Sequence, residues 1–143
     1  MEEWDPWVIG SVSKEALLET DSGWTAWFDD AYTNGALVPS VSFLAQQLKV
    51  PGIVVVSIPE SRGNRSVRWG ARQLEIFGPE TTDFINYVRT ISVVNDGGRW
   101  RFDANGEVQP FEEAENYRRR RVAERFSEEM LVDYCAALGL RPF

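Results

Sequence analysis

The sequence predicts an α+β fold, with a small antiparallel sheet of about four to five strands flanked by helices and with two helices at the C-terminal end. Three observations indicate this fold. Residues 53–58 form a continuous β-branched run, Asn95-Asp96-Gly97-Gly98 lies between two apolar alternations, and helical patterns follow Pro110. Neither a repeat nor a linker-like stretch interrupts the chain, so residues 1–143 are expected to form a single domain.

A helix is expected just before the β-branched run. Its apolar residues have helical spacing: Val41, Phe43, Leu44, Ala45 and Leu48. Ser40 or Ser42 is the expected cap, because a hydroxyl can accept a hydrogen bond from an amide of the first turn. Val50-Pro51-Gly52 is expected to end this helix.

Two strands follow this helix in the prediction. The first covers residues 53–58 (IVVVSI), which are apolar enough to be buried on both faces. Residues 59–64 (PESRGN) have the composition of a turn. Residues 67–77 are expected to return as a second strand that breaks near Gly70.

The strongest hairpin signal lies at residues 95–98 (NDGG), because glycine accepts positive φ without steric cost. Residues 103–106 (DANG) predict a second reversal directly after it, which gives a three-stranded antiparallel meander. Residues 84–89 also fit a helix, with Phe84, Ile85 and Val88 on one side, and the sequence leaves this choice open.

Two helices are expected after Pro110. Residues 110–126 hold glutamates in the first turns and arginines in the later ones, an order that complements the helix dipole. Several of these side chains have opposite charges three or four residues apart, which favours a solvated, salt-bridged face. Ser127 is the expected cap of the last helix, whose inner face consists of Met130, Leu131, Tyr134, Cys135 and Leu138, and Gly139 ends it.

The first 38 residues fit two templates. Residues 17–28 can form a hairpin that turns at Asp21-Ser22-Gly23. Alternatively, a helix capped by Asp21 or Ser22 places Trp24, Trp27 and Phe28 on its inner stripe. The sequence alone does not choose between them.

Composition excludes several classes of enzyme. The chain has no histidine, so it cannot contain a Ser-His-Asp or Cys-His nucleophile system or a histidine-ligated zinc ion. Its single cysteine, Cys135, excludes an intramolecular disulfide and is expected to be a small core residue. Phosphate-binding glycine motifs are missing as well, and no cofactor or metal is expected. The acidic N-terminus and the lack of a long apolar run predict a cytoplasmic protein that binds no membrane.

The acidic charge is concentrated at the start of the chain. Residues 1–30 hold eight acids and one base, Lys14, whereas the 14 acids after residue 30 are matched by 14 bases. The same 30 residues contain Trp4, Trp7, Trp24, Trp27 and Phe28. Acids interleaved with large aromatics suit the binding of a cationic protein, since charge raises the encounter rate and buried aromatics anchor the complex.

We therefore expect a partner-binding surface at Asp21, Trp24, Trp27, Asp29 and Asp30. The simpler interpretation is that the aromatic residues form the core and the acids are the solvated edge of that core.

Two other kinds of chemistry are compatible with the sequence. A pair of carboxylates, with Asp29-Asp30 as the natural place to look, would suit a small hydrolase. The arginines of residues 118–125 would suit a nucleic-acid-binding helix, although the neighbouring glutamates favour a solvated face instead. The primary expectation is that the chain is not an enzyme and binds no nucleic acid.

Several short stretches in the second half of the chain carry a resemblance to a known family. They are residues 70–71 (GA), 76–79 (IFGP), 86–91 (NYVRTI), 95–100 (NDGGRW), 110–112 (PFE), Tyr117, 119–125 (RRRVAER), 129–131 (EML) and 136–139 (AALG). In residues 70–140 the chain resembles the small bacterial immunity proteins of polymorphic toxin systems. The resemblance implies a cytoplasmic domain, often α+β, that binds and occludes one cognate toxin and catalyses nothing.

Overall fold

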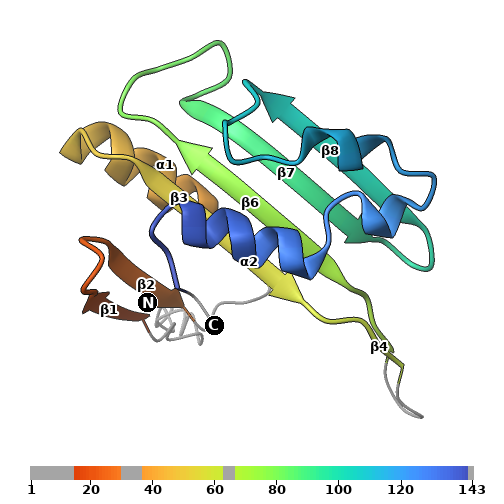
Figure 1. Cartoon of the computed structure of the whole chain (residues 1–143). Helices are drawn as coiled ribbons and strands as arrows, with labels where there is room; N and C mark the ends of the chain where they lie inside the picture. Colours follow the sequence, from red (N-terminus) through yellow and green to blue (C-terminus); the bar gives the residue numbers. More distant parts are fainter. Residues whose placement is uncertain (1–14, 30–36, 63–66, 142–143) are drawn as a thin grey trace, which may run out of the picture. The chain divides into compact units, whose positions relative to one another are not determined.

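The computed structural model describes residues 15–29, 37–62 and 67–141, and the chain divides into two compact units, Met1–Ala36 and Leu37–Phe143. Figure 1 colours both units along the sequence. The first unit contributes a β-hairpin, and the second unit contributes a four-stranded antiparallel sheet with two α-helices. The α+β class is therefore confirmed, while the expectation of a single domain stays a prediction.

The hairpin of the first unit consists of β1 (Glu15–Glu19) and β2 (Thr25–Asp29). Its turn closes where the Thr20 amide and hydroxyl both donate to the Trp24 carbonyl, at 2.9 and 2.7 Å. Gly23 has a φ of +82° in this turn, a conformation that suits glycine. Of the two templates for this region, the hairpin is confirmed and the helix is wrong.

The sheet of the second unit has the order β3-β6-β7-β8, and every neighbouring pair is antiparallel. These strands are β3 (Gly52–Ile58), β6 (Ala71–Phe77), β7 (Tyr87–Asn95) and β8 (Trp100–Gly106). Beyond the break predicted near Gly70, the short strands β4 (Ser61–Arg62) and β5 (Val67–Arg68) form a two-stranded ladder. The strands predicted over residues 53–58 and 67–77 and the turn at residues 95–98 are confirmed.

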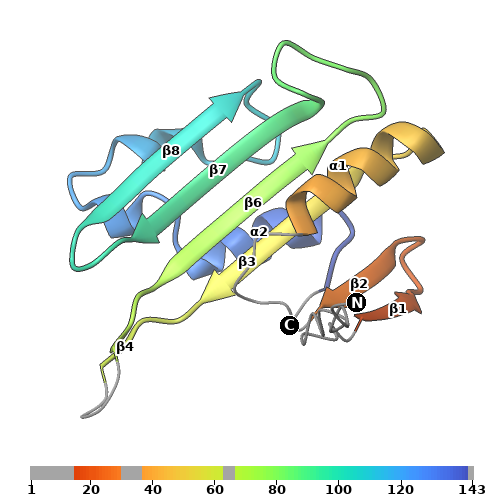
Figure 2. The ribbon, with the colours of Figure 1, turned by 180° about the vertical axis from the view of Figure 1, so that it is seen from behind.

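The two α-helices cover opposite faces of this sheet, as the two views in Figures 1 and 2 show. Helix α2 (Glu128–Ala137) covers the face that holds the main core. The buried residues of this core are Leu74, Ile76, Ile91, Val93, Phe126, Met130, Leu131, Tyr134 and Cys135. Helix α1 (Leu37–Leu48) lies against the other face, where Ala45 packs with Val54 and Phe77.

Close packing of α1 requires a glycine at the start of β3. A Cβ atom on Gly52 would lie 2.7 Å from Val41 Cγ1, so any larger residue would push the helix away from the strand. Helix α1 begins at Leu37, which places Ser40 and Ser42 inside the helix. The prediction that one of them caps the helix is therefore wrong. Ser42 instead points toward the sheet and is buried.

The helix expected over residues 110–126 is wrong, so a single α-helix stands at the C-terminal end. Two short 3-10 helices, η1 (Ala114–Arg118) and η2 (Val122–Glu124), take its place. The apolar side chains of this segment that belong to the core or pack against it are Phe111, Tyr117, Val122 and Phe126, and the steps of six and five residues between the first three are not helical. Arg72 also donates to the carbonyls of Ala123 and Phe126, at 2.9 and 2.7 Å. Tertiary contacts thus outweigh the local helix propensity.

The reversal predicted at residues 103–106 is also wrong, because all four residues pair with β7 as part of β8. The meander that exists is β6-β7-β8. The helix considered for residues 84–89 is absent too, since β7 begins at Tyr87. The cap of α2 is confirmed, with Ser127 Oγ accepting from the Met130 amide at 3.2 Å.

No helix in the described part of the chain is both long and apolar enough to cross a membrane.

Candidate functional site

The structure places most of the predicted binding residues on one hairpin. Asp21 lies exposed in its turn, Trp24 lies partly buried directly before β2, and Trp27 lies partly buried in the middle of β2. Asp29 ends β2, where its backbone pairs with Glu15. Asp30, together with Trp4 and Trp7, lies outside the described residues. The hairpin therefore brings Asp21, Trp24, Trp27 and Asp29 into one short element.

The hairpin exposes apolar side chains on both of its faces. The register pairs Leu17 with Trp27 on one face, and Leu18 with Ala26 on the other. Leu17, Leu18 and Phe28 are exposed to 68%, 56% and 58%. Large apolar side chains gathered in solvent are typical of an interaction surface. The alternation of residues along the sequence predicts which side chains share a face of the hairpin, but it does not predict that side chains on both faces are exposed.

Trp27 also has a polar group without a partner. Its indole Nε1 is shielded from solvent, yet it has no hydrogen-bond acceptor within the part of the chain that the structure describes. A shielded donor of this kind costs about 1–3 kcal/mol when it stays unsatisfied.

A buried ion pair on the α2 face of the sheet was not predicted. Arg89 of β7 donates from Nε and Nη2 to the two carboxylate oxygens of Glu112, at 2.8 and 2.7 Å, and both side chains are buried. Arg89 Nη1 donates to the Gly106 carbonyl at 2.9 Å, and the Gln109 amide donates to Glu112 at 2.8 Å. We call these contacts the Arg89–Glu112 clasp. One signal was available, because Arg89 alternates with Ile91 and Val93 and so shares their buried face.

Two tyrosines extend the clasp toward α2. Tyr117 Oη donates to Glu112 Oε2 at 2.7 Å and lies 3.2 Å from Tyr134 Oη. The Tyr134 oxygen accepts from the Glu113 amide at 2.7 Å, which leaves its own proton to donate to Tyr117. Burial contributes most to raising the pKa of both tyrosines above the ordinary value. These hydroxyls therefore keep their protons near neutral pH and act as hydrogen-bond donors within the network.

Glu75 lies on the opposite face of the sheet, where it is buried without a cationic partner. Its Oε1 accepts from Gln73 Nε2, whereas Oε2 has no hydrogen-bond partner among the described residues. Burial raises the pKa of Glu75, although hydrogen bonds from Gln73 and Tyr87 oppose this effect. Glu75 is the one acid for which a raised pKa is resolved in the described ranges. It lies apart from the predicted carboxylate pair.

Cys135 has no nucleophilic character. It is fully buried on the inner face of α2, and burial raises the pKa of its thiol to about 11. The thiol is therefore protonated near neutral pH and unreactive. The expectation that Cys135 is a small core residue is confirmed.

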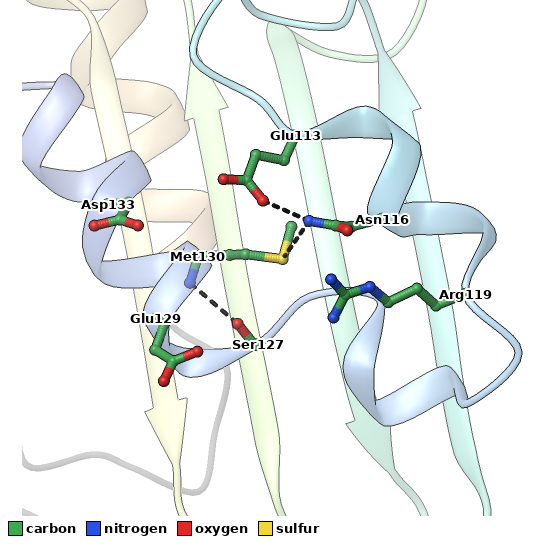
Figure 3. A pocket seen from close by; sticks show the side chains of 7 residues that line it. All are labelled: Glu113, Asn116, Arg119, Ser127, Glu129, Met130 and Asp133. Carbon is green, nitrogen blue, oxygen red and sulfur yellow. Dashed lines mark hydrogen bonds between the residues drawn. The ribbon is translucent and has the colours of Figure 1, made fainter.

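A shallow polar depression lies between η1 and the start of α2. Figure 3 shows that Arg119 and Asn116 reach into it from the 3-10 segment, while Glu129 and Asp133 leave α2 in different directions. Its volume is about 160 Å³, and Glu113 is partnered by Asn116. Across the described residues, no three acidic or cysteine side chains are close enough together to hold a metal ion. The depression therefore lacks convergent carboxylates.

Other acidic residues that could form a catalytic pair are separated in the structure. Asp83, Asp96 and Glu107 are exposed on different loops, and Asp96 pairs with Arg101 at 2.8 Å. The side chains of Asp29 and Asp30 lie outside the described part of the molecule. The carboxylate hypothesis thus has no geometry to support it among the described side chains.

The arginine run does not form the basic helix considered for nucleic acid. Residues 118–121 are exposed, and they span the end of η1 and the turn before η2. Arg121 pairs with Glu124 at 3.1 Å, as the sequence predicted. Arg125 turns back to donate to the Arg119 carbonyl at 2.9 Å and lies 5.9 Å from the centre of the Phe102 ring.

No family model, curated protein or solved structure matches this chain. Its function is therefore inferred from the surfaces and buried groups described above.

Proposed function

We propose that this chain is a non-catalytic, cytoplasmic protein-binding domain, an immunity protein that binds a cationic bacterial toxin domain and occludes it. The observation that supports this proposal is the hairpin, on which the exposed residues Leu17, Leu18 and Phe28 lie close to acidic residues. A two-stranded hairpin cannot bury its own apolar side chains, because each face has nothing but the strands beneath it. A partner laid on either face would bury them.

Charge supports a cationic partner. Glu19 and Asp21 are exposed around the hairpin turn, and residues 1–30 carry the whole excess of acid over base in the chain. Opposite charge steers two proteins together and raises the association rate, whereas buried aromatic and aliphatic side chains slow dissociation. The hairpin offers both kinds of group.

The required affinity is within reach of such a surface. Nanomolar binding corresponds to about −12 kcal/mol. A standard interface buries roughly 800 Å² on each partner, and a few well-buried side chains contribute most of its free energy. Trp27 and Leu17, which pair on one face of the hairpin, are the anchors that this proposal assigns to it.

The decisive experiment uses the gene beside the one that encodes this chain. The tagged full-length chain is co-expressed with the product of that gene. The complex is then purified, and its molecular weight is measured. We expect the neighbour to be toxic when expressed alone, to be harmless with this chain, and to co-purify with it. A neighbour that is neither toxic nor bound would refute the proposal.

The kinetics of the complex test the role of the hairpin. Replacing Asp21, Asp29 and Asp30 with Asn should slow association at low salt and flatten its salt dependence, because the steering charge is lost. Thermal melting of the variant checks that the fold survives, and Asp21, which is exposed, should contribute little stability. Stopped-flow mixing over a range of salt concentrations measures both effects.

A matched control removes three acids from the other unit: Glu107→Gln, Glu115→Gln and Asp133→Asn, all at exposed positions. The same total charge is lost, so equal slowing by both variants would contradict a role for the hairpin. Trp27→Ala should raise the dissociation rate if the ring is an interface anchor. A large drop in melting temperature for Trp27→Ala would instead assign that ring to the core.

A further inference from the structure

Strand β8 forms one edge of the four-stranded sheet. One of its sides pairs with β7 over residues Trp100–Gly106, and within the described ranges no strand pairs with its other side. Figures 1 and 2 both show β8 as the outermost strand of the sheet on that side. An open edge offers unpaired N–H and C=O groups to any further strand, so proteins usually protect such an edge.

Several of the usual means of protection are absent from β8. Its register with β7 continues without a bulge, and its sequence, WRFDANG, contains neither proline nor lysine. Its two charged side chains, Arg101 and Asp103, are exposed and have opposite signs. They therefore do not repel a strand that carries both signs of charge.

The hydrogen bonds of the β7–β8 hairpin show which β8 residues point outward. The Asp96 amide donates to the Arg99 carbonyl at 3.2 Å, which makes these two residues a hydrogen-bonded pair. Such pairs alternate with non-hydrogen-bonded pairs along an antiparallel ladder. When the register is followed from this pair, the odd-numbered residues of β8 bond to β7. The even-numbered residues therefore direct their N–H and C=O groups outward.

Three of these even-numbered residues have free outward groups. The Gly106 carbonyl already accepts from Arg89 Nη1 at 2.9 Å. The outward groups of the others make no backbone hydrogen bond among the described residues: Trp100, Phe102 and Ala104. The side chains of Trp100 and Phe102 pack against the main core, so the strand itself is held firmly in place. The open edge thus extends from Trp100 to Ala104.

A second copy of β8 matches this open edge when Phe102 lies on a two-fold axis. In a two-fold interface each residue meets the same surface of the other copy in reverse. Phe102 then lies opposite Phe102 of the second copy, and Trp100 lies opposite Ala104. Each of these pairs exchanges both backbone hydrogen bonds, as in an ordinary antiparallel ladder. Every free outward group of the edge is satisfied in this arrangement.

The same register pairs opposite charges on the other face of the strand. Arg101 lies opposite Asp103 of the second copy, at a non-hydrogen-bonded position where side chains are closest. Asp103 accepts from Asn105 at 2.6 Å and has no cationic partner among the described residues. Arg101 pairs with Asp96 at 2.8 Å, but both side chains are exposed, and such a pair is weak. Arg101 can therefore turn to the second copy.

Other two-fold registers are less complementary. An axis at Arg101 or at Asp103 places identical charges directly opposite each other, which is unfavourable. An axis at Ala104 brings in Gly106, whose carbonyl is already engaged. That register also places Asp103 opposite Asn105 rather than opposite a cation. The open backbone groups and the charges thus favour the same register, and this agreement is the argument for a second copy as the occupant of the edge.

We propose that two copies of this chain associate through their β8 edges, in the antiparallel register centred on Phe102, and form one continuous sheet. The proposal concerns the second unit and does not depend on the toxin-binding role of the hairpin. Pairing of two short strands buries less than the roughly 800 Å² per partner of a standard interface. We therefore expect a dimer that forms at roughly micromolar concentration rather than at nanomolar concentration.

Sedimentation velocity of the full-length chain, from low to high micromolar concentration, tests this proposal. We expect a concentration-dependent dimer for the wild-type chain. Asp103→Arg and Arg101→Asp each place like charges opposite one another twice in the interface, so each variant should dimerise at least roughly tenfold more weakly. Asp133→Arg and Arg118→Asp are the matched controls, since they make the same changes of charge at exposed positions outside β8. Both controls should dimerise like the wild-type chain.

A mixture of the two β8 variants tests the register itself. In a mixed dimer, the two arginines of Asp103→Arg lie opposite the two aspartates of Arg101→Asp. The mixture should therefore form a heterodimer at concentrations at which each variant alone is monomeric. This recovery also shows that both variants are folded. A mixture that stays monomeric, while each variant has the circular dichroism spectrum of the wild-type chain, would overturn the proposal.

A pair of cysteine variants gives a second test that does not depend on the charges. The register places residue 101 opposite residue 103 of the second copy, whereas two residues 103 lie too far apart for a disulfide. Cys135 is buried and does not compete. Under mild oxidation, a mixture of Arg101→Cys and Asp103→Cys should therefore form linked dimers faster than either variant alone. Equal rates would show that random collisions cause the linkage and would overturn the proposal.

Three further results would overturn it. The first is a wild-type chain that stays monomeric at every concentration. The second is dimerisation of Asp103→Arg and of Arg101→Asp with the affinity of the wild-type chain, which would place the dimer interface elsewhere. In the third, Asp103→Arg leaves the molecular weight unchanged and weakens binding of the product of the adjacent gene, which would assign the β8 edge to that partner.

Discussion

At the residue scale, two buried ionisable side chains have very different surroundings. Glu75 and Arg89 lie on neighbouring strands and on opposite faces of the sheet, and both are almost fully buried. Arg89 has a carboxylate partner in bidentate geometry, whereas one carboxylate oxygen of Glu75 has no hydrogen-bond partner among the residues that the structure describes. Burying a charge is costly unless it is paired and hydrogen-bonded. Arg89 is thus stabilised in its charged form, and Glu75 is not.

Glu75 should make stability depend on pH. Its pKa is raised above the ordinary value of 4.5, so the folded state holds this proton more tightly than the unfolded state. The contribution to stability is present below pH 4.5 and is lost as the pH rises through the raised value. Glu75→Gln, which cannot ionise, should therefore be more stable than the wild-type chain at pH 7.5 and gain no such advantage at pH 4.

Urea unfolding of both chains at several pH values measures this difference. Comparing the variant with the wild type cancels the titration of all other groups, which the two chains share. Glu107→Gln, at an exposed position, is the control and should show no such trend. If the difference between Glu75→Gln and the wild type is constant with pH, Glu75 is not desolvated.

At the scale of elements, the Arg89–Glu112 clasp attaches the segment after β8 to strand β7. The two residues are 23 positions apart in the chain. Tyr117 of η1 bonds to the Glu112 carboxylate, and Tyr134 of α2 bonds to Tyr117, so the clasp also links both elements to the sheet. The segment from Glu107 to Arg118 has little regular structure of its own, and these side-chain contacts fix its path.

Breaking one half of the clasp should cost more than removing both halves. Glu112→Leu leaves Arg89 buried without its anion, and such a loss typically destabilises by about 3–5 kcal/mol. The double variant Arg89→Met, Glu112→Leu replaces the pair with apolar groups and should recover a large part of that stability. A double-mutant cycle from denaturant unfolding gives the coupling. Single and double variants of equal stability would contradict an energetic role for the pair.

The elements that could be predicted from the sequence are those specified by nearby residues. The β-branched run of residues 53–58, the glycines at 97 and 98, and the Ser127 cap each act within a few positions. Residues 110–126 could not be predicted correctly, because Glu112 and Ala123 are held by Arg89 and Arg72, which lie far away in the sequence. Their local charge pattern favours a helix, and distant partners prevent it.

The candidate surfaces were predictable to a similar extent. The sequence gathered Asp21, Trp24 and Trp27 in one region, and the hairpin was one of two ways to arrange them. The exposure of Phe43, Leu44 and Leu48 on α1 could not be predicted, because helical spacing shows which residues share a face but not which face is covered.

At the scale of the whole molecule, the buried residues of the main core all belong to the second unit, as far as the described residues show. A chain limited to residues 37–143 should therefore fold by itself, with a single cooperative transition in thermal and urea unfolding. Circular dichroism of this shortened chain beside the full-length chain tests the expectation. A broad, non-cooperative transition would show that residues 1–36 are needed for the fold and would support one domain.

The order of the strands has a consequence for synthesis on the ribosome. Strand β6 pairs with β7, and β7 pairs with β8, so this part of the sheet can assemble as the nascent chain emerges. Leu74, Ile91 and Val93 are then in place, but Phe126 and α2, which cover them, have not yet been translated. A stalled chain that ends between β8 and Phe126 therefore carries an uncovered apolar sheet face, the kind of surface that chaperones bind and that aggregates.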